Sequence, residues 1–312
     1  MKNFTAYLQS KDLSPVTIGL YIRQIHYFIA WYGSEDIINV QKKDVLNYLN
    51  YLKQKNLQAN TRNQHLISLR HYFDNLVQQE AIKINPTSLI KLRGVQNRKL
   101  QYVYSSDELT QLADNYYLLY VKQTQEKVII KGAGSYMFKR THLAKIRNYV
   151  MLQMFIHQGL HTKEVLQLQL QNIDLQKATV TIQTTTKGKD RTIPLHVTQI
   201  GSLMQYLNEV RPNLETKNTD DTLFLPIPKD DPKAKKKPEA TFKRMVEQLK
   251  KTDRNFINLV QIRTSVITYW VKNYGLRKAQ YFAGHKSITS TEQYQANNIE
   301  DLAEDITKFN PF

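Results

Sequence analysis

Apolar residues recur every three or four positions through the first part of the chain. The first such run follows the Ser14-Pro15 pair, a favourable helix start, and stops at Gly33. This period corresponds to one face of a helix, so the run predicts a helix that is buried along that side. The repeated residues are Ile18, Ile22, Ile25 and Ile29.

Two further helices are predicted by the same pattern. One begins near Asp44, and the next runs from Thr61. The Asn85-Pro86 step then breaks the pattern, because proline disfavours a helical conformation of the residue before it. We therefore expect a helical bundle over residues 1–92. Its inward-facing side chains in these two helices are Val45, Leu49, Leu52, Leu66, Leu69, Phe73 and Leu76.

A change of pattern marks a second domain. Residues 93–104 are polar, basic and aperiodic, which is typical of an interdomain linker. Ser105 and Glu108 resemble a capping box that opens the next helix. In 178–195, alternation on both sides of a Lys-Gly-Lys-Asp turn predicts a β-hairpin. Residues 105–312 are thus expected to form a mixed α+β domain with a small antiparallel sheet. Its other helices are expected at 144–158, 163–170, 197–210, 240–251 and 258–274, and no element is assigned to 129–140.

The charge balance favours a polyanionic partner. The chain of 312 residues has 44 lysines and arginines against 27 aspartates and glutamates, a formal net charge of +17. Such an excess favours nucleic acid binding through counterion release, although a basic protein with another role fits the charge as well. The densest basic run, residues 229–239, is expected to be a solvated loop.

Composition excludes some chemistry and some locations. The chain has no cysteine, which excludes disulfides, thiolate zinc sites and cysteine nucleophiles. The N-terminal stretch has no apolar signal segment, and no window approaches the roughly eighteen consecutive apolar residues of a membrane span. We therefore expect a soluble cytoplasmic protein.

Four short segments carry the candidate chemistry. They place Lys187 at the predicted hairpin tip, Arg263 near a helix start, and His285 nine residues before Tyr294. In chain order the segments are HQGLHTKEVLQL, TTKGKDRTIPL, LVQIRTSVITYWVKNYGL and GHKSITSTEQY. The set resembles the catalytic domain of the tyrosine recombinase or phage integrase family. The N-terminal bundle resembles the SAM-like core-binding domain of that family, so the resemblance covers nearly the whole chain.

The resemblance implies a role for each residue. Tyr294 would attack a DNA phosphodiester to give a 3′-phosphotyrosine and a free 5′-hydroxyl. Lys187 would be the general acid for the 5′-oxygen, Arg263 would hold non-bridging oxygens, and His285 would donate to the phosphate. Because the covalent link retains the bond energy, the family chemistry implies no metal or other cofactor.

Two positions depart from the family pattern. His161 stands where the family has its first arginine, and Val260 stands at the histidine of the His-x-x-Arg motif. Protonated His161 could contact the phosphate in place of the arginine, or another cation could reach in. Alternatively, the site has decayed and the protein only binds DNA, or His161 is an ordinary helix-terminal histidine. The other cations considered are Arg140, Arg147 and Lys163.

The remaining candidates would contact the DNA backbone, which positions a duplex without reading its sequence. They are Lys53, Arg62 and Arg70 in the bundle and Lys189 and Arg191 in the hairpin. His65 and His71 are too far apart for a metal pair and are expected at the surface or on DNA, so no metal site is predicted. Tyr48, Tyr51, Trp31 and Trp270 are expected to pack in the cores.

The resemblance implies site-specific recombination, such as integration or excision of a mobile element. The partners would be double-stranded DNA with a specific site, enclosed by the two domains as a C-shaped clamp, and further copies of the chain. Four copies would pair two sites and pass strands through a Holliday junction. The rival is a DNA-binding protein that cleaves nothing, and a type IB topoisomerase shares the chemistry.

The acidic tail, residues 297–312, is expected to form a short helix that docks on a neighbouring subunit and closes a ring. Deleting it should leave DNA binding near the wild-type level and abolish synapsis, as measured by gel shift and by recombination of two sites. Recombination by the truncated protein would contradict this expectation.

Overall fold

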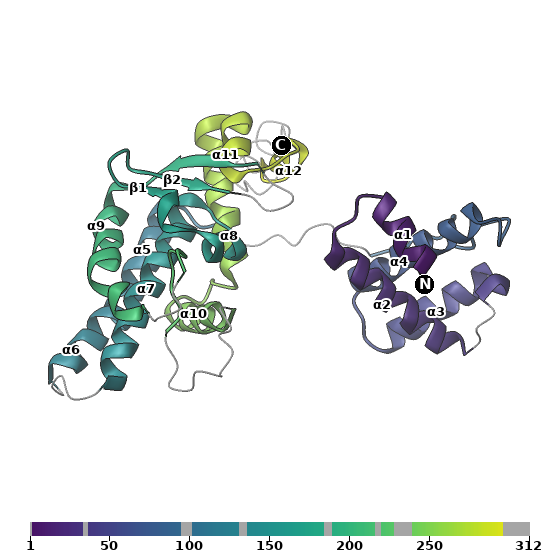
Figure 1. Cartoon of the computed structure of the whole chain (residues 1–312), viewed down its shortest axis with the longest axis horizontal. Coiled ribbons are helices and arrows are strands. Elements are labelled where there is room, and N and C mark those ends of the chain that lie inside the picture. Colours follow the sequence, from purple (N-terminus) through teal and green to yellow (C-terminus); the bar gives the residue numbers. More distant parts are fainter. Residues whose placement is uncertain are drawn as a thin grey trace, which may run out of the picture. The chain divides into compact units, whose positions relative to one another are not determined.

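The chain folds into two compact units. The structure, a computed structural model, describes residues 2–33, 37–94, 102–130, 136–183, 189–215, 220–227 and 239–295. The units are Met1–Lys99 and Leu100–Phe312, each with its own hydrophobic core (Figure 1). The limits of the linker predicted at 93–104 stay a prediction, since much of that stretch lies outside the described residues.

The first unit is a helical bundle, as predicted. Its elements are α1 (Lys2–Ser10), α2 (Pro15–Tyr32), the 3₁₀ turn η1 (Ile37–Asn39), α3 (Lys42–Gln54) and α4 (Ala59–Gln78). Helix α2 packs against α1, α3 and α4 (Figure 1). The helices therefore bury their apolar faces against one another, in agreement with the isoleucine and leucine repeats.

Local signals set the ends of α2. The Ser14 side chain accepts a hydrogen bond from the Thr17 amide, and Gly33 ends the helix in the left-handed conformation with φ 72°. The Gly33 amide donates to the Ile29 carbonyl at 3.1 Å. Serine satisfies a free amide at the start and glycine tolerates positive φ at the end, so both predicted boundaries are confirmed.

An aromatic cluster fills the first core. Phe28 meets Tyr48 and Phe73 edge to face, at centroid distances of 5.0 and 6.3 Å. The expected surface position of His65 is wrong: it is 7% exposed, and its Nδ1 lies 3.0 Å from the Tyr48 hydroxyl. Burial lowers the pKa of His65. The histidine is buried because Tyr48 supplies the hydrogen bond that an imidazole needs away from water.

Residues after α4 are tied back to that helix. Buried Asn85 donates to the Arg70 carbonyl at 3.1 Å and to the Asp74 carboxylate at 2.7 Å. Arg70 in turn donates to the Ile90 carbonyl at 3.0 Å. One nitrogen of the Arg70 guanidinium therefore bonds within the bundle, and contact of Arg70 with DNA stays a prediction.

The second unit is mostly helical, with one small sheet. The capping box at Ser105 and Glu108 is confirmed: the Ser105 side chain accepts from the Glu108 amide, and Glu108 accepts from the Ser105 amide. The elements are α5 (Ser106–Tyr116), η2 (Tyr117–Lys122), α6 (Gln123–Ile130), α7 (Tyr136–Gln158), α8 (Thr162–Gln167), η3 (Leu170–Asn172), β1 (Ile173–Asp174), β2 (Thr179–Ile182), β3 (Arg191–Pro194), α9 (Val197–Gln205), η4 (Tyr206–Val210), η5 (Pro212–Leu214), α10 (Glu239–Thr252), α11 (Leu259–Ala283) and α12 (Thr289–Glu292).

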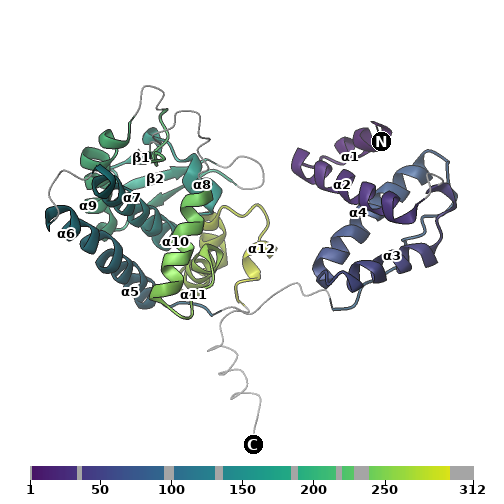
Figure 2. The same ribbon diagram turned by 90° about the horizontal axis from the view of Figure 1, so that it is seen from below.

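The predicted hairpin is confirmed. Strands β1, β2 and β3 form an antiparallel sheet in that order, which lies next to α9 (Figure 2). Val180 pairs with Ile193, and both side chains are buried. The hairpin tip, residues 184–188, lies outside the described residues.

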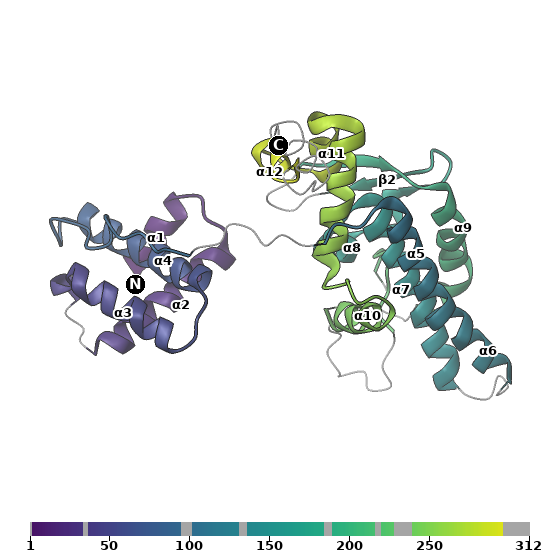
Figure 3. The same cartoon turned by 180° about the vertical axis from the view of Figure 1, so that it is seen from behind.

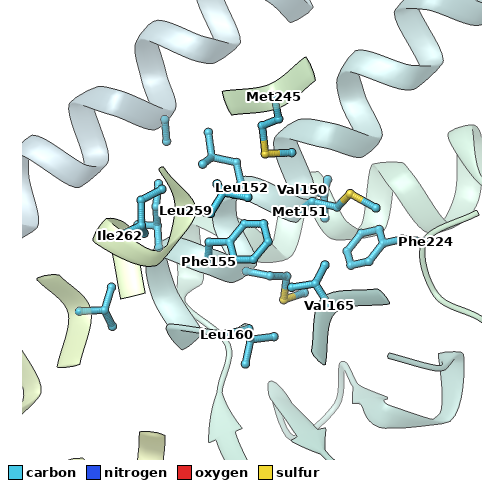
Figure 4. Packing of buried hydrophobic residues seen from close by; sticks show 14 of the residues in the cluster. Val150, Met151, Leu152, Phe155, Leu160, Val165, Phe224, Met245, Leu259 and Ile262 are labelled. Carbon is cyan, nitrogen blue, oxygen red and sulfur yellow. The ribbon is translucent and has the colours of Figure 1, made fainter. Parts of the chain in front are cut away.

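Helix α7 is central to the second core. It packs against α5, α9 and α11 (Figure 3). Figure 4 shows Phe155 of α7 among side chains from α8, α10 and α11, namely Val165, Met245 and Ile262. Trp270 also lies in this core, as expected, at 6% exposed. Helices α8 and α11 therefore share one hydrophobic core with α7.

Two segments differ from the predicted elements. Helix α7 begins at Tyr136, within the stretch that carried no assignment. Helix α11 continues to Ala283, but Gly275 has φ 76° and ψ 166° and kinks it, so the predicted end at 274 falls at this kink. The predicted helix in residues 297–312 and the loop 229–238 lie outside the described residues. Over the described part of the chain, no helix is long and apolar enough to cross a membrane.

Gly159 makes the turn between α7 and α8. Its φ is +55°, and an added Cβ would lie 3.1 Å from both Trp270 and Val266. Other residues are strained at positive φ, and here the neighbours are large buried side chains. The turn between α7 and α8 therefore requires glycine, because of its positive φ and because of the close approach of Trp270 and Val266.

We expect Gly159→Ala to lower the free energy of unfolding of the second unit by about 1 to 3 kcal/mol. In a Trp31→Phe background, Trp270 is the only remaining tryptophan and its fluorescence follows this unit. Gly201→Ala is the matched control, because Gly201 is exposed in α9 with nothing within 4 Å of its added Cβ. That change should stabilise by about 0.5 to 1 kcal/mol. Equal effects of the two changes would contradict the packing argument.

Candidate active site

Helices α8, α11 and α12 bring four of the predicted residues together. His161 is the N-cap of α8, Arg263 lies in the first turns of α11, and His285 follows the Gly284 cap at the end of α11. Tyr294 follows α12. Residues more than a hundred positions apart thus meet where the ends of these helices converge.

Arg263 is the buried centre of the group. It is 3% exposed, and its guanidinium donates to the Gly159 carbonyl and, at 2.7 Å, to the Ala283 carbonyl. Its Nη1 lies 3.7 Å from Oε2 of Glu164. Two carbonyls and a carboxylate therefore hold the planar fork in one orientation.

His285 lies between Arg263 and the candidate nucleophile. Its Nε2 is 3.4 Å from Arg263 Nη2, and its Nδ1 is 2.9 Å from the Thr291 hydroxyl. The Tyr294 ring stacks on the imidazole, with 5.8 Å between centroids and 18° between planes. Burial, and then the charge of Arg263, lowers the pKa of His285 to about 4. The imidazole is therefore neutral at pH 7.

His161, expected from the resemblance to stand at an arginine position, lies at the start of α8. Its side chain is exposed, and its backbone amide donates to Glu164 at 2.8 Å. Desolvation by neighbouring protein atoms, followed by the charge of Arg263, lowers its pKa to about 4. His161 is thus also neutral at pH 7. The positive charge beside it is that of the Arg263 guanidinium.

Glu164 links these groups, and the sequence analysis did not single it out. It is 9% exposed and accepts from Arg191 at 2.8 Å as well as from the His161 amide. Burial acts to raise the pKa of Glu164, but the hydrogen bond and charge of Arg191 outweigh it and hold the pKa below its usual value. The spacing of N-cap and third helical residue in His-Thr-Lys-Glu could have indicated its capping role.

The prediction made for Arg191 is wrong. Arg191 was expected to contact DNA phosphates, but it is 2% exposed and paired with Glu164. The alternation along β3 explains this, because Arg191 and Ile193 face inward while Thr192 faces outward. A basic residue in an exposed hairpin looks like a phosphate contact from its sequence, and only its register in the sheet shows otherwise.

The other candidates differ in burial, and one lies outside the description. Arg147 was considered as a replacement cation, but it is 3% exposed and donates to the Leu225 carbonyl at 2.7 Å, so it is part of the core. Val260 is 57% exposed in the first turn of α11. Lys187 lies outside the described residues. Lys53 is exposed, Arg62 and Arg140 are half-buried, and Lys163 and Lys189 are exposed. Among the described residues, no three His, Asp or Glu side chains are grouped to hold a metal ion.

Several known proteins are similar to the chain over nearly its whole length. The TnP I resolvase of Bacillus thuringiensis is 25% identical over 305 residues, which are 95% of each chain. The tyrosine recombinase XerC of Natranaerobius thermophilus is 26% identical over 321 residues and covers 99% of this chain, with 97% of its own length covered. Among solved structures, the Tn1549 transposon integrase in complex with transposon right end DNA has a TM-score of 0.69 at 15% identity, over 99% of this chain and 98% of that one.

Two parts of the chain match family descriptions. Residues 1–83 match the N-terminal SAM-like domain of phage integrases, which agrees with the helical bundle of the first unit. Residues 119–301, more than half of the chain, match the phage integrase family and contain the four segments with the candidate chemistry. The resemblance in those segments is thereby confirmed, and the chain belongs to the phage integrase family.

Proposed function

We propose that the protein catalyses site-specific DNA recombination, with Tyr294 as the nucleophile. The observation that carries this proposal is the convergence of Arg263, His285 and Tyr294 in one group, with the tyrosine ring stacked on the imidazole. The similar proteins named as recombinases and as a resolvase support the reaction class.

The proposed step is a transesterification. The Tyr294 hydroxyl gives its proton to water as its oxygen bonds to phosphorus, and the bond to the 5′-oxygen breaks, which leaves a 3′-phosphotyrosine and a 5′-hydroxyl. Lys187 gives a proton to the departing oxygen. Arg263 offers N–H groups to the non-bridging oxygens, where negative charge increases in the transition state, and His285 donates to them once the phosphate has raised its pKa. Gly159, Ala283 and Glu164 hold the Arg263 guanidinium in place for this task.

His161 takes the place of a bidentate cation. One such transition-state contact is worth about 3 kcal/mol, so its loss slows cleavage unless another group supplies charge. His161 is exposed and beside Arg263, so an anionic phosphate placed there would raise its pKa from about 4 and oppose the effect of the arginine. We propose that His161 is a weak substitute for the arginine.

The proposed substrate is double-stranded DNA with a specific recombination site, and the proposed assembly is a tetramer on two paired sites. The net charge of +17 fits a polyanionic partner. A similar structure, with a TM-score of 0.63, is a lambda integrase tetramer bound to a Holliday junction. Integration or excision of a mobile element is the proposed use, and Lys53, Arg62, Arg70 and Lys189 are proposed contacts with the DNA backbone.

A second candidate is a DNA-binding protein that does not cleave. The observation in its favour is His161 itself, because a neutral histidine replaces a permanent charge in the site. The retained group of Arg263, His285 and Tyr294 favours the first proposal, since DNA binding alone does not need a tyrosine placed beside a buried arginine.

Covalent capture tests the two candidates. A nicked suicide duplex taken from DNA flanking the gene should form a covalent adduct with the wild-type protein on a denaturing gel. Tyr294→Phe should form none, because the nucleophilic oxygen is absent. His161→Arg should increase the rate of adduct formation by about 100-fold, since it restores a charged donor. Tight binding by the wild type without any adduct would instead support the DNA-binding candidate.

The lowered histidine pKa values predict how stability depends on pH. An unfolded histidine has a pKa near 6.5, so between about pH 4 and 6.5 the unfolded chain binds more protons than the folded one. Stability of the second unit should therefore be full above pH 6.5 and fall as the pH drops towards 4. Urea unfolding of the Trp31→Phe protein at pH 7 and pH 5 measures this change.

His285→Asn should reduce the difference in stability between pH 7 and pH 5, because it removes one of the groups with a lowered pKa. His26→Asn is the control, since His26 is exposed in the first unit. An equal pH dependence in the wild type and His285→Asn would contradict the protonation state given for His285.

A further inference from the structure

Strand β3 and the residues just before it are joined to the end of α11 by three hydrogen bonds. The Lys189 amide donates to the Gly284 carbonyl at 3.1 Å, and Arg191 Nε donates to the Phe282 carbonyl at 2.7 Å. The Thr192 amide donates to the Tyr281 hydroxyl at 3.2 Å. The second strand of the hairpin and the turn before His285 are thus joined by backbone and side-chain hydrogen bonds.

The Arg191 side chain also reaches the other half of the site. It is fully buried, and its Nη1 lies 2.8 Å from Oε1 of Glu164. The second Glu164 oxygen accepts from the His161 amide at 2.8 Å and lies 3.7 Å from Arg263 Nη1. One carboxylate therefore connects β3 to the start of α8 and to the arginine of α11.

The turn that precedes His285 fits against this guanidinium. Gly284 has φ +69°, and an added Cβ would lie 2.6 Å from Arg191 Nη1. Two constraints thus require glycine here, the left-handed backbone and the close approach of the guanidinium. The path of the chain into His285 is set partly by where Arg191 lies.

Only the planar fork of arginine meets this geometry. Nε and Nη1 bond two acceptors on different elements at once, the Phe282 carbonyl and the Glu164 carboxylate. A lysine ammonium is a single point and cannot reproduce both directions. Without Arg191, the buried carboxylate would lose its closest cation and turn towards Arg263, the next cation at 3.7 Å.

We propose that Arg191 is a positioning residue for the recombination reaction. Its buried guanidinium holds Glu164 and the Gly284 turn, and so fixes Arg263 and His285 relative to strand β3. It acts without touching DNA. This inference rests on the proposed function, because it assigns Arg191 a part in the same cleavage step.

The test compares Arg191→Gln, Arg191→Lys and Glu164→Gln with the wild type on the nicked suicide duplex. Both Arg191 variants should slow adduct formation by about 100-fold at saturating DNA, the effect of a misplacement of about 1 Å in a site. Their affinity for the duplex should stay within about threefold, because a buried residue makes no phosphate contact. The double variant Arg191→Gln/Glu164→Gln should form the adduct nearly as fast as Glu164→Gln alone, since the two residues act as one unit.

Two readouts separate positioning from a loss of folded protein. Thr192→Val is the matched control on the outward face of the same strand and should cleave at the wild-type rate. The second readout is the titration of His285 followed by NMR. Burial lowers the pKa of His285 most, and the charges of Arg263, His161 and then Arg191 lower it further against Glu164, so Arg191→Gln should raise that pKa. A change that only reduced the amount of folded protein would leave the pKa of the folded fraction unchanged.

Three outcomes would overturn the inference. They are a wild-type adduct rate in Arg191→Gln, full rescue by Arg191→Lys, and weakened DNA binding with normal cleavage at saturation. If the wild-type protein forms no adduct, the proposed function fails. In that case the NMR titration of Arg191→Lys, which keeps the charge but loses the planar fork, still shows whether Arg191 positions His285, so the two failures are distinguishable.

Discussion

The buried carboxylate of Glu164 connects the elements that form the candidate active site of the second unit. Glu164 lies between Arg191 and Arg263 and also accepts from the His161 amide, so three elements meet at a single side chain. A buried charge is costly unless it is paired and hydrogen-bonded, and here both oxygens are satisfied. The same pairing makes two buried guanidinium groups tolerable beside one another. The positions of α8, β3 and α11 therefore depend on one another through Glu164.

This arrangement also contributes to the low proton affinity of the site. Burial is the larger cause of the low pKa values of His161 and His285, about 4 each, and the positive charge of Arg263 and Arg191 lowers them further. Because Arg263 can only donate, Nε2 of the neutral His285 faces it as an acceptor, and the single N–H of the ring is on Nδ1, towards the Thr291 hydroxyl. A phosphate that entered the site would place negative charge beside these histidines and raise their pKa values. The site is thus prepared to accept an anion rather than to hold extra protons.

Patterns of period and spacing predicted much of the fold. The isoleucine repeat between Ser14 and Gly33 determined α2, and the alternation in 178–195 determined the hairpin, because both depend on interactions between near neighbours. The interval from His285 to Tyr294, taken with Arg263, indicated the family. Sequence could not predict that His65 is buried, since this needs Tyr48 on another helix as a hydrogen-bond partner. Nor could it predict the length of α11, because the kink at Gly275 allows the helix to resume.

By itself, then, the sequence determined the family, the two kinds of domain and most of the residues that meet at the candidate site. Only the tertiary structure decided which basic residues are free to meet a phosphate and which are buried. Arg191 and Arg147 look like surface cations along the chain, yet each is buried with acceptors supplied by distant segments. Charge and local pattern are properties of the sequence, whereas burial and pairing depend on residues that only folding brings within hydrogen-bond distance.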